Sequence, residues 1–399
     1  MRKNFLPYAL PSIGAEEIEE VVDSLRSGWI TTGPKVAKFE EQFAKYVGSR
    51  HAIAVNSCTA ALHVILTALG IRPGDEVIVP TLTFCSTAHV VAHLGAKPVL
   101  VDVDKNGQIS LDAVERAITW KTRGVIPVHY AGQPCDIGPL LQLAETHGID
   151  VIEDAAHAVG ADYAGRKIGT HGRAIAFSFY ATKNLATGEG GMITTCDSEL
   201  AARMRPLVLH GMNHDAWNRY SSSGSWYYEV AELGYKYNMM DIQAALGIHQ
   251  LRKLDALNAR RIQIAAKYTE AFAAMDEIHT PEELPDRTHV FHLYPIQVHG
   301  LSIDRAVFIN ELRNANIGTS VHFIPLHRHP FYRERYGYRI ADFPVAEHLY
   351  TGLVSLPLYP SMTDGDVQDV IDTVRQIVTK YRGMPRVAQL RALSAGGER

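Results

Sequence analysis

The sequence of residues 150–157 is Asp-Val-Ile-Glu-Asp-Ala-Ala-His, an apolar run that ends in an acidic residue and small side chains. Val151 and Ile152 are typical of a strand buried on both faces, because helices cover both sides of a parallel sheet. Asp154 would then lie at the carboxyl end of the strand, the edge where open α/β sheets bind ligands. The stretch therefore predicts a buried strand that carries a carboxylate to a ligand-binding edge.

Similar apolar runs occur on both sides of this stretch, and most are separated by a segment long enough for a helix. Such repetition of strand and helix is typical of an α/β fold with a mostly parallel sheet. The last two runs leave little room for a helix between them, so we expect at least one antiparallel strand there. The runs span residues 51–56, 76–80, 98–102, 124–129, 174–179 and 191–195.

The flanks of this core predict further elements. Residues 15–27 carry apolar side chains at helical spacing, which indicates an amphipathic helix. Residues 239–267 predict a long helix, and residues 290–380 mix strands and helices as a smaller α+β domain does. We expect an N-terminal segment, a large domain, a small C-terminal domain and a frayed tail at residues 1–14, 15–255, 256–383 and 384–399.

The composition of the 399 residues excludes several classes of protein. The net charge of −4 argues against a nucleic-acid-binding protein, which usually has a basic excess. The four cysteines form no CxxC pair, so we expect a cytoplasmic protein without a disulfide framework. No apolar run approaches the roughly 18 residues that cross a bilayer, and the N-terminus does not match a signal peptide. We therefore expect neither a nucleic acid nor a membrane as partner.

Common nucleotide and metal motifs are missing from the sequence. There is no GxxxxGK[ST] loop and no GxGxxG after a strand, and the glycines of residues 187–192 have the wrong spacing. Two HxxxH pairs, His89 with His93 and His210 with His214, lack the adjacent glutamate of an HExxH site. We therefore expect no metal.

Two features of the predicted core suit an anionic ligand, although each has a simpler explanation. Residues 56–61, Asn-Ser-Cys-Thr-Ala-Ala, join a strand to a helix, and free backbone N–H groups there suit a phosphate. The alternative is an N-cap formed by Ser57 or Thr59. Asp154 would need a cation or a donor if it were buried, and its alternative is helix capping.

The third feature is Lys183, which lies between an apolar strand and the glycine-rich turn at residues 188–191. A desolvated lysine has a lowered pKa and can form a Schiff base, and the alternative is a surface lysine at a strand end. A phosphate cradle, a carboxylate for a pyridinium nitrogen and a Schiff-base lysine are together the requirements of pyridoxal 5′-phosphate. The three features in this order predict that cofactor.

With these motifs in view, the sequence resembles the sugar aminotransferases of the DegT/DnrJ/EryC1/StrS family. That resemblance implies the type I aminotransferase fold, a mostly parallel seven-stranded sheet flanked by helices plus a smaller C-terminal α+β domain. It is strongest to the branch that aminates a UDP-linked 4-keto pentose on the way to the 4-amino-4-deoxy-L-arabinose of lipopolysaccharide, and the 4-aminotransferases of UDP-4-keto-6-deoxy-hexosamines are similar as well. The matching stretches are residues 27–34, 74–80, 128–132, 152–157, 177–184, 234–238 and 241–245, and only the tail after about residue 383 lies outside.

The resemblance also implies roles for the residues around the cofactor. Lys183 forms the Schiff base and moves protons, Asp154 pairs with the pyridine nitrogen, and His157 lies near the ring hydroxyl. Phe84 stacks on the ring, where many relatives have tryptophan. The phosphate is held by Thr59, Ala60, Ser178 and, from the neighbouring subunit of a homodimer, Asn238.

The same resemblance implies the substrates. Trp29, Ile30 and Thr31 match the segment that lines the sugar–nucleotide cleft, and His327 falls in the region that meets the diphosphate. Tyr180 stands where several 4-aminotransferases have histidine. The implied reaction moves an amino group from L-glutamate to a keto sugar nucleotide, best matched by C4 amination of a UDP-4-keto sugar. The alternatives are a related sugar dehydratase, in which histidine replaces the Schiff-base lysine, and a non-catalytic regulatory homologue.

Overall fold

The computed structural model describes residues 2–212 and 227–382. A seven-stranded sheet forms its centre, with the strand order β1-β9-β8-β5-β4-β2-β3. Strand β9 runs antiparallel to β1 and β8, and the other neighbouring pairs are parallel, which confirms the predicted sheet. The strands are β1 (His51–Val55), β2 (Glu76–Pro80), β3 (Lys97–Val101), β4 (Thr122–Val125), β5 (Asp150–Asp154), β8 (Ala174–Ser178) and β9 (Gly191–Thr195).

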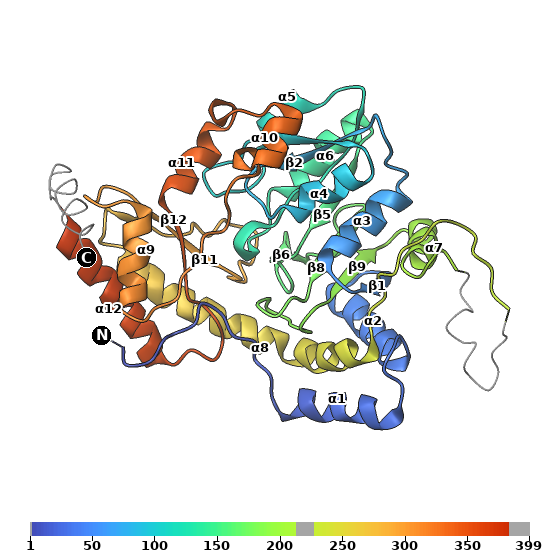
Figure 1. The fold of residues 1–399 in the computed structure, drawn as a ribbon, viewed down its shortest axis with the longest axis horizontal. Coiled ribbons are helices and arrows are strands. Elements are labelled where there is room, and N and C mark those ends of the chain that lie inside the picture. Colours follow the sequence, from blue (N-terminus) through green and yellow to red (C-terminus); the bar gives the residue numbers. More distant parts are fainter. Residues whose placement is uncertain (1, 213–226, 383–399) are drawn as a thin grey trace, which may run out of the picture.

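Helices cover both faces of this sheet (Figure 1). One face is covered by α3 (Cys58–Ala68), α4 (Ser86–His93) and α7 (Ser198–Leu207). The other face is covered by α2 (Pro34–Val47), α5 (Leu111–Ala117), α6 (Ile137–His147) and the first half of α8 (Asp241–Phe272). The remaining elements of this part are α1 (Ala15–Ser27), η1 (Tyr130–Gly132) and the hairpin of β6 (Asp162–Tyr163) and β7 (Arg166–Lys167).

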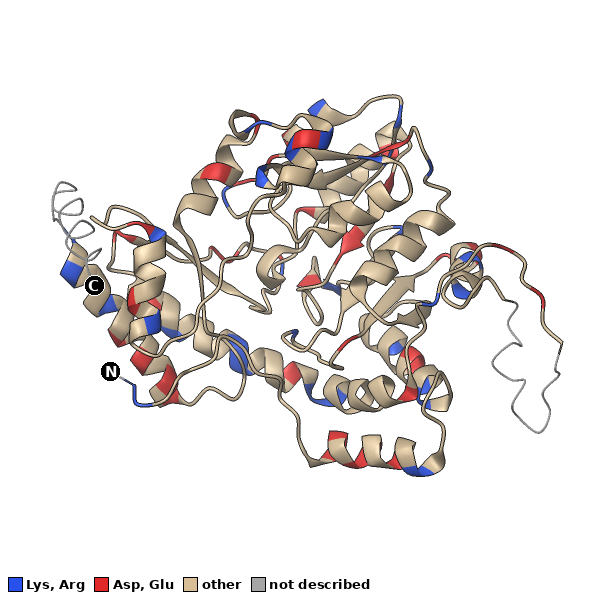
Figure 2. Cartoon of the chain, viewed as in Figure 1, with Lys and Arg blue, Asp and Glu red and all other residues tan. Residues whose placement is uncertain are grey.

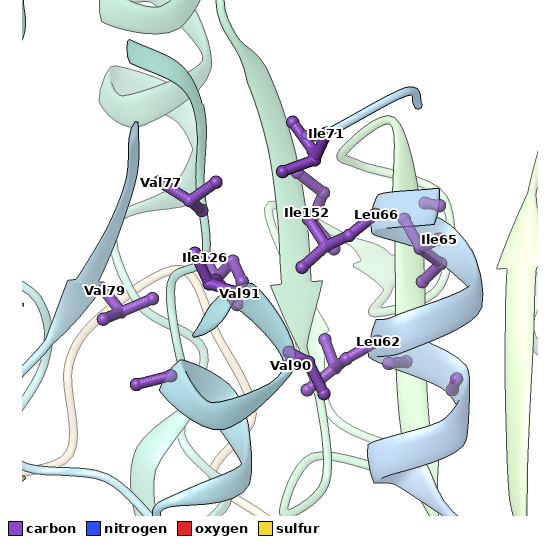
Figure 3. Close-up of a cluster of buried hydrophobic side chains, with 14 of the residues drawn as sticks. Leu62, Ile65, Leu66, Ile71, Val77, Val79, Val90, Val91, Ile126 and Ile152 are labelled. Carbon is purple, nitrogen blue, oxygen red and sulfur yellow. The ribbon is translucent and has the colours of Figure 1, made fainter. Parts of the chain in front are cut away.

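Side chains alternate between the two faces of each strand, as the pleat of a β-strand requires. In β2, Val77 and Val79 join the core beneath α3 and α4, whereas Ile78 joins a separate core beneath α5 and α6. Figure 3 shows the first of these cores, in which Leu66 of α3 lies next to Ile152 of β5. Burial of both faces explains why the strand sequences are nearly continuous apolar runs.

Helix α8 connects the large sheet to the C-terminal part of the chain (Figure 1). Ile248 and Leu254 pack in the core under the large sheet, whereas Ile264 and Tyr268 pack in the core of a second, three-stranded sheet. The elements of this part are β10 (Ile278–His279), β11 (Tyr294–Val298), β12 (Leu353–Leu356), α9 (Arg305–Asn314), η4 (Leu326–Arg328), α10 (Pro330–Tyr336), η5 (Ile340–Asp342), α11 (Pro344–Gly352) and α12 (Asp364–Tyr381).

Acidic and basic residues are interspersed along the outer helices (Figure 2). In the described ranges, no helix has both the length and the apolar composition needed to cross a membrane. The tail expected at residues 384–399 lies outside the described residues. Buried polar groups interrupt the apolar cores at the carboxyl ends of the central strands, and they indicate a functional site there.

Candidate active site

Lys183 lies in the loop that follows β8 and leads back to β9. The loop folds against the sheet, since the Thr187 N–H donates a 2.8 Å hydrogen bond to the carbonyl oxygen of Phe179. Burial lowers the pKa of Lys183 to about 8. An amine with such a pKa is substantially neutral near pH 8, and a neutral amine is both a nucleophile and a proton acceptor.

Asp154 is buried at the end of β5, as the sequence predicts. Its Oδ2 accepts a 2.9 Å hydrogen bond from the Thr87 hydroxyl, and its Oδ1 accepts a 3.1 Å bond from the Ala156 N–H. Burial raises the pKa of Asp154, and these two donors oppose the rise. Because a carboxylate offers about four lone-pair positions, capacity remains for a cationic N–H partner.

The N-terminus of α3 lies beside this carboxylate, since Cys58 Sγ is 3.9 Å from Asp154 Oδ1. The Ser57 hydroxyl caps the helix by accepting the Ala60 N–H at 3.1 Å, so the simpler N-cap interpretation is correct for Ser57. The N–H groups of Cys58 and Thr59 belong to the first turn, which has no intrahelical acceptors. The cap and an anion site are therefore compatible, but the N–H of Ala60 is already engaged.

His157 follows Asp154 and is buried, and its Nδ1 has no hydrogen-bond partner among the described residues. Its ring centroid lies 4.4 Å from that of His292, and the ring stacks on Phe323 at 5.9 Å. Burial lowers the pKa of His157 well below its usual value, so the ring is neutral. A buried nitrogen without a partner is costly and indicates a polar ligand at this point.

Three residues of this site belong to no motif of the sequence. His292 Nε2 lies 3.4 Å from Lys183 Nζ, and His322 Nδ1 lies 2.9 Å from the Ser355 hydroxyl. His322 is followed by Phe323, whose ring lies 6.1 Å from that of Phe84. His292, His322 and Phe323 belong to the C-terminal part of the chain and match no local motif, so only the fold brings them to Lys183.

Two aromatic side chains assigned to the cofactor or the sugar are exposed, whereas Ser178 is buried. Phe84 and Tyr180 have exposed fractions of 58% and 47%, so each aromatic ring is available to a ligand. The hydroxyl of Ser178 is close to the loop backbone and accepts a 3.4 Å hydrogen bond from the Tyr180 N–H. No described contact tests their assigned roles, which stay predictions.

Asn238 and the segment that includes Trp29 and Thr31 form a second group. Asn238 Nδ2 donates a 2.7 Å hydrogen bond to the Thr32 hydroxyl, and Trp29 Nε1 donates to the Thr32 carbonyl oxygen at 3.0 Å. The carbonyl oxygen of Thr31 accepts the first N–H of α8 at 3.0 Å, and Ile30 is half exposed. Among the described residues, none of these side chains makes a hydrogen bond to Lys183, Asp154 or His157.

His327 has a different environment from the one the sequence suggested. It is buried, and its Nδ1 and Nε2 each lie 2.7 Å from a partner, the Thr81 hydroxyl and Glu347 Oε1 respectively. The ring also stacks on Phe343 at 4.3 Å. With both nitrogens engaged inside the protein, His327 has no free donor for a diphosphate, and this geometry argues against its assigned role as a ligand.

The residues brought together fit pyridoxal phosphate. A lysine amine of lowered pKa, a buried carboxylate, the first turn of a helix and the unpartnered Nδ1 of His157 are the groups that this cofactor requires. No set of three or more metal-ligating side chains within residues 2–212 and 227–382 has the arrangement to hold a metal ion. His89 stacks on Tyr332 at 5.6 Å, whereas His214 lies outside the described residues.

Comparison with known proteins agrees with this geometry. The model of the DegT/DnrJ/EryC1/StrS aminotransferase family matches residues 11–375. The spore coat polysaccharide biosynthesis protein SpsC of Bacillus subtilis is 56% identical over 382 residues, which cover 94% of this chain and 98% of SpsC.

Two solved structures show the same fold at similar coverage. Spr1654 of Streptococcus pneumoniae in its PLP form has a TM-score of 0.88 at 35% identity, over 94% of this chain and 99% of that one. PseC of Helicobacter pylori, an aminotransferase involved in the biosynthesis of pseudoaminic acid, has a TM-score of 0.87 at 28% identity, over 95% of this chain and all of that one. The chain therefore belongs to the DegT/DnrJ/EryC1/StrS aminotransferase family and is a PLP-dependent transaminase.

Proposed function

We propose that the chain is a nucleotide-sugar aminotransferase, which moves the amino group of L-glutamate to C4 of a UDP-linked 4-keto sugar. The family assignment supports a sugar as acceptor, as do the names of SpsC and PseC, which refer to a coat polysaccharide and to pseudoaminic acid. The observation that carries the proposal is Lys183, whose pKa burial lowers to about 8 and whose amine interacts electrostatically with the buried Asp154. The proposed place of reaction is the cytoplasm.

Pyridoxal phosphate, when bound, supplies an aldehyde that receives the amino group and a ring that stabilises negative charge on the substrate. The buried carboxylate of Asp154 would keep the ring nitrogen protonated, which strengthens that effect. The first turn of α3, with Thr59, would hold the phosphate, and His157 Nδ1 would meet a polar group of the ring. Phe84 and Tyr180, both exposed, would contact the ring and the sugar.

Lys183 is proposed to carry the protons. With a pKa of about 8, the amine exists in both protonation states near neutral pH, so it could accept a proton from Cα of glutamate and deliver one to the former aldehyde carbon of the cofactor. The second half of the reaction uses the same lysine in reverse, on the keto sugar. An exposed lysine of ordinary pKa would be protonated almost completely and could not act as the base.

The proposed active unit is a homodimer. Asn238 and residues 29–31 form a group of their own, apart from the hydrogen bonds around Lys183. In a two-fold dimer the same surface occurs on both subunits, so this group can complete the partner's site. Asn238 would then approach the phosphate and residues 29–31 would line the sugar–nucleotide cleft of the other subunit.

The alternatives are a sugar dehydratase of the same family and a non-catalytic homologue. The dehydratases that the sequence resembles have histidine in place of the Schiff-base lysine, whereas this chain has Lys183. A non-catalytic homologue is expected to lack at least one of Asp154, Lys183 and Asn238, but all three are present. Both observations favour transamination.

A panel of nucleotide keto sugars tests the proposal. UDP, dTDP and GDP sugars with the carbonyl at C3 or C4 are incubated with the holoenzyme and ¹⁵N-labelled L-glutamate, and products are read by mass. We expect nitrogen incorporation, fastest at C4 of a UDP sugar, and none with Lys183→Ala. Loss of water without nitrogen incorporation would indicate the dehydratase, and no turnover of any sugar would indicate the non-catalytic homologue.

A further inference from the structure

A chain of buried hydrogen bonds connects Lys183 with the long helix α8. Asn258, on α8, donates through Nδ2 to the carbonyl oxygen of Val159 at 3.1 Å. Asn184 donates through Nδ2 to Asn258 Oδ1 at 2.8 Å and to the carbonyl oxygen of Val290 at 3.1 Å. Asn184 Oδ1 lies 3.1 Å from His292 Nδ1.

Two backbone carbonyl oxygens, those of Val159 and Val290, determine the direction of the bonds in this chain. A carbonyl oxygen only accepts, so the atom of Asn184 that faces Val290 has to be the amide nitrogen. Oδ1 of Asn184 therefore faces His292 and accepts, which requires a hydrogen on His292 Nδ1. Burial lowers the pKa of His292 well below its usual value. Because a neutral imidazole has a single N–H, the Nε2 of His292 carries a lone pair.

That lone pair is directed at the amine of Lys183, with Nε2 and Nζ 3.4 Å apart. The backbone of His292 is held as well, since Arg261 Nη1 donates to its carbonyl oxygen at 3.4 Å and to that of Leu358 at 2.8 Å. From this geometry we infer that His292 is a positioning residue, which accepts an N–H of the free Lys183 amine and holds Nζ in place while the amine takes and gives protons.

An acceptor of this kind suits a lysine that has to change its protonation state. A neutral imidazole accepts an N–H from either the amine or the ammonium form, so Nζ need not move when its charge changes. An imidazolium would repel the ammonium form, and the Asn184 carbonyl, by fixing the tautomer, keeps the donor on the far side of the ring. The other titratable groups that act on Lys183 or are affected by its charge are Asp154, Cys58, His157 and His322.

The inference rests on the proposed role of Lys183, so its test measures the amine itself and not only turnover. In His292→Asn, the amide nitrogen takes the place of Nδ1 and still reaches Asn184, but no atom faces Lys183. In His292→Gln, the side-chain amide reaches the position of Nε2 and can present its oxygen to Lys183. His289→Asn is the matched control, because His289 is equally buried three residues earlier but stacks on Phe291 at 3.8 Å.

The measurement is the pH dependence of acetic anhydride labelling of Lys183 in the full-length chain freed of cofactor, read by peptide mass spectrometry. The ammonium form loses an acceptor in His292→Asn, so we expect its pKa to fall by about one unit. His292→Gln and His289→Asn should remain close to the wild type. An unchanged or raised pKa in His292→Asn, or the same shift in His289→Asn, would overturn the inference.

A second measurement on the wild type covers the case in which a variant does not fold. Proton-coupled ¹⁵N spectra of the histidine rings of the cofactor-free chain report the tautomer. We expect one buried ring with hydrogen on Nδ1 only, whose Nε2 signal moves as Lys183 titrates and no longer moves in Lys183→Met. If the spectra contained no signal of such a ring, the inference would be overturned.

The holoenzyme separates this inference from the proposed function. In a single turnover with L-glutamate, His292→Asn should slow proton transfer about tenfold with unchanged glutamate affinity. His292→Gln should restore part of the rate. If Lys183→Ala kept normal turnover, the proposed function would fail as well, whereas wild-type rates in His292→Asn together with an inactive Lys183→Ala would reject only the role of His292.

Discussion

The hydroxyl of Thr87, on α4, donates a 2.9 Å hydrogen bond to Oδ2 of Asp154, at the end of β5. Both residues are buried, and the Thr87 hydroxyl is itself 3.0 Å from that of Thr83. Burial raises the pKa of Asp154, and the Thr87 bond is the largest influence that lowers it. A threonine 67 residues away in sequence therefore helps to keep this carboxylate ionised for the cofactor nitrogen.

We predict that Thr87→Val weakens cofactor binding without removing it. Valine has the shape of threonine but no hydrogen-bond donor, so the pKa of Asp154 should rise further. A smaller fraction of Asp154 is then ionised, and the carboxylate pairs less strongly with a pyridinium nitrogen. A hydrogen bond to a charged group suggests roughly a tenfold rise in the dissociation constant of pyridoxal phosphate. The constant is measured by absorbance titration of the cofactor-free chain. Thr83→Val, which leaves the Thr87 donor in place, is the control, and an equal loss in both variants would contradict the prediction.

We predict that Lys183 makes the stability of the cofactor-free chain depend on pH. Burial lowers the pKa of Lys183 from 10.5 to about 8, so between these values the unfolded chain binds more protons than the folded one. Stability then rises with pH across this window, and below pH 8 the lysine destabilises the cofactor-free fold. Lys183→Met should therefore be more stable than the wild type at pH 7, by on the order of 2 kcal/mol.

Urea unfolding of the cofactor-free proteins at pH 7 and pH 10 measures this difference in the free energy of unfolding. Subtracting the wild-type value from the variant value removes the contributions of all other titrating groups. We expect the advantage of Lys183→Met to shrink as pH rises from 8 toward 10.5. Lys35→Met is the matched control, because the ion pairs of Lys35 raise its pKa. A constant advantage of Lys183→Met at all pH values would mean that packing, and not charge, causes it.

The sequence was sufficient for the sheet and for the parts of the site that lie at strand ends. Asp154 ends a buried strand and Lys183 follows one, so local pattern located them. His292 could not be found in this way, because it lies 109 residues from Lys183 and its role depends on tertiary hydrogen bonds. The same limit applies to Thr87, which has no distinguishing neighbours in the sequence.

His327 shows an error of the opposite kind. The family resemblance predicts that this histidine contacts the diphosphate of the substrate. In the fold its ring is buried between Thr81 and Glu347, and neither nitrogen is free. Sequence position alone does not distinguish a histidine that faces a cleft from one that fills the space beneath it. The distinction needs the positions of the partners, Thr81 directly after β2 and Glu347 on α11.

We therefore predict that His327→Ala loses stability and not substrate affinity. The substitution leaves a cavity and removes one hydrogen bond each from the Thr81 hydroxyl and from Glu347, which keeps Arg328 as a partner. Together these losses suggest a decrease of about 3 kcal/mol in unfolding free energy. Chemical denaturation measures the loss, and steady-state kinetics at a temperature where the variant is folded should give a KM for the nucleotide sugar within about twofold of wild type. A much higher KM at unchanged stability would restore the ligand interpretation.

The last prediction tests whether Asn238 serves the partner's site. Lys183→Ala and Asn238→Ala, each much less active as a homodimer, are co-produced with different tags, and the mixed dimer is isolated by two affinity steps. If Asn238 completes the other subunit's site, one site of the mixed dimer has both wild-type residues and the other has neither. The mixed dimer should then recover about half of the wild-type activity, as two-fold symmetry requires. If Asn238 instead served its own chain, every site would lack one residue, and mixing would restore nothing.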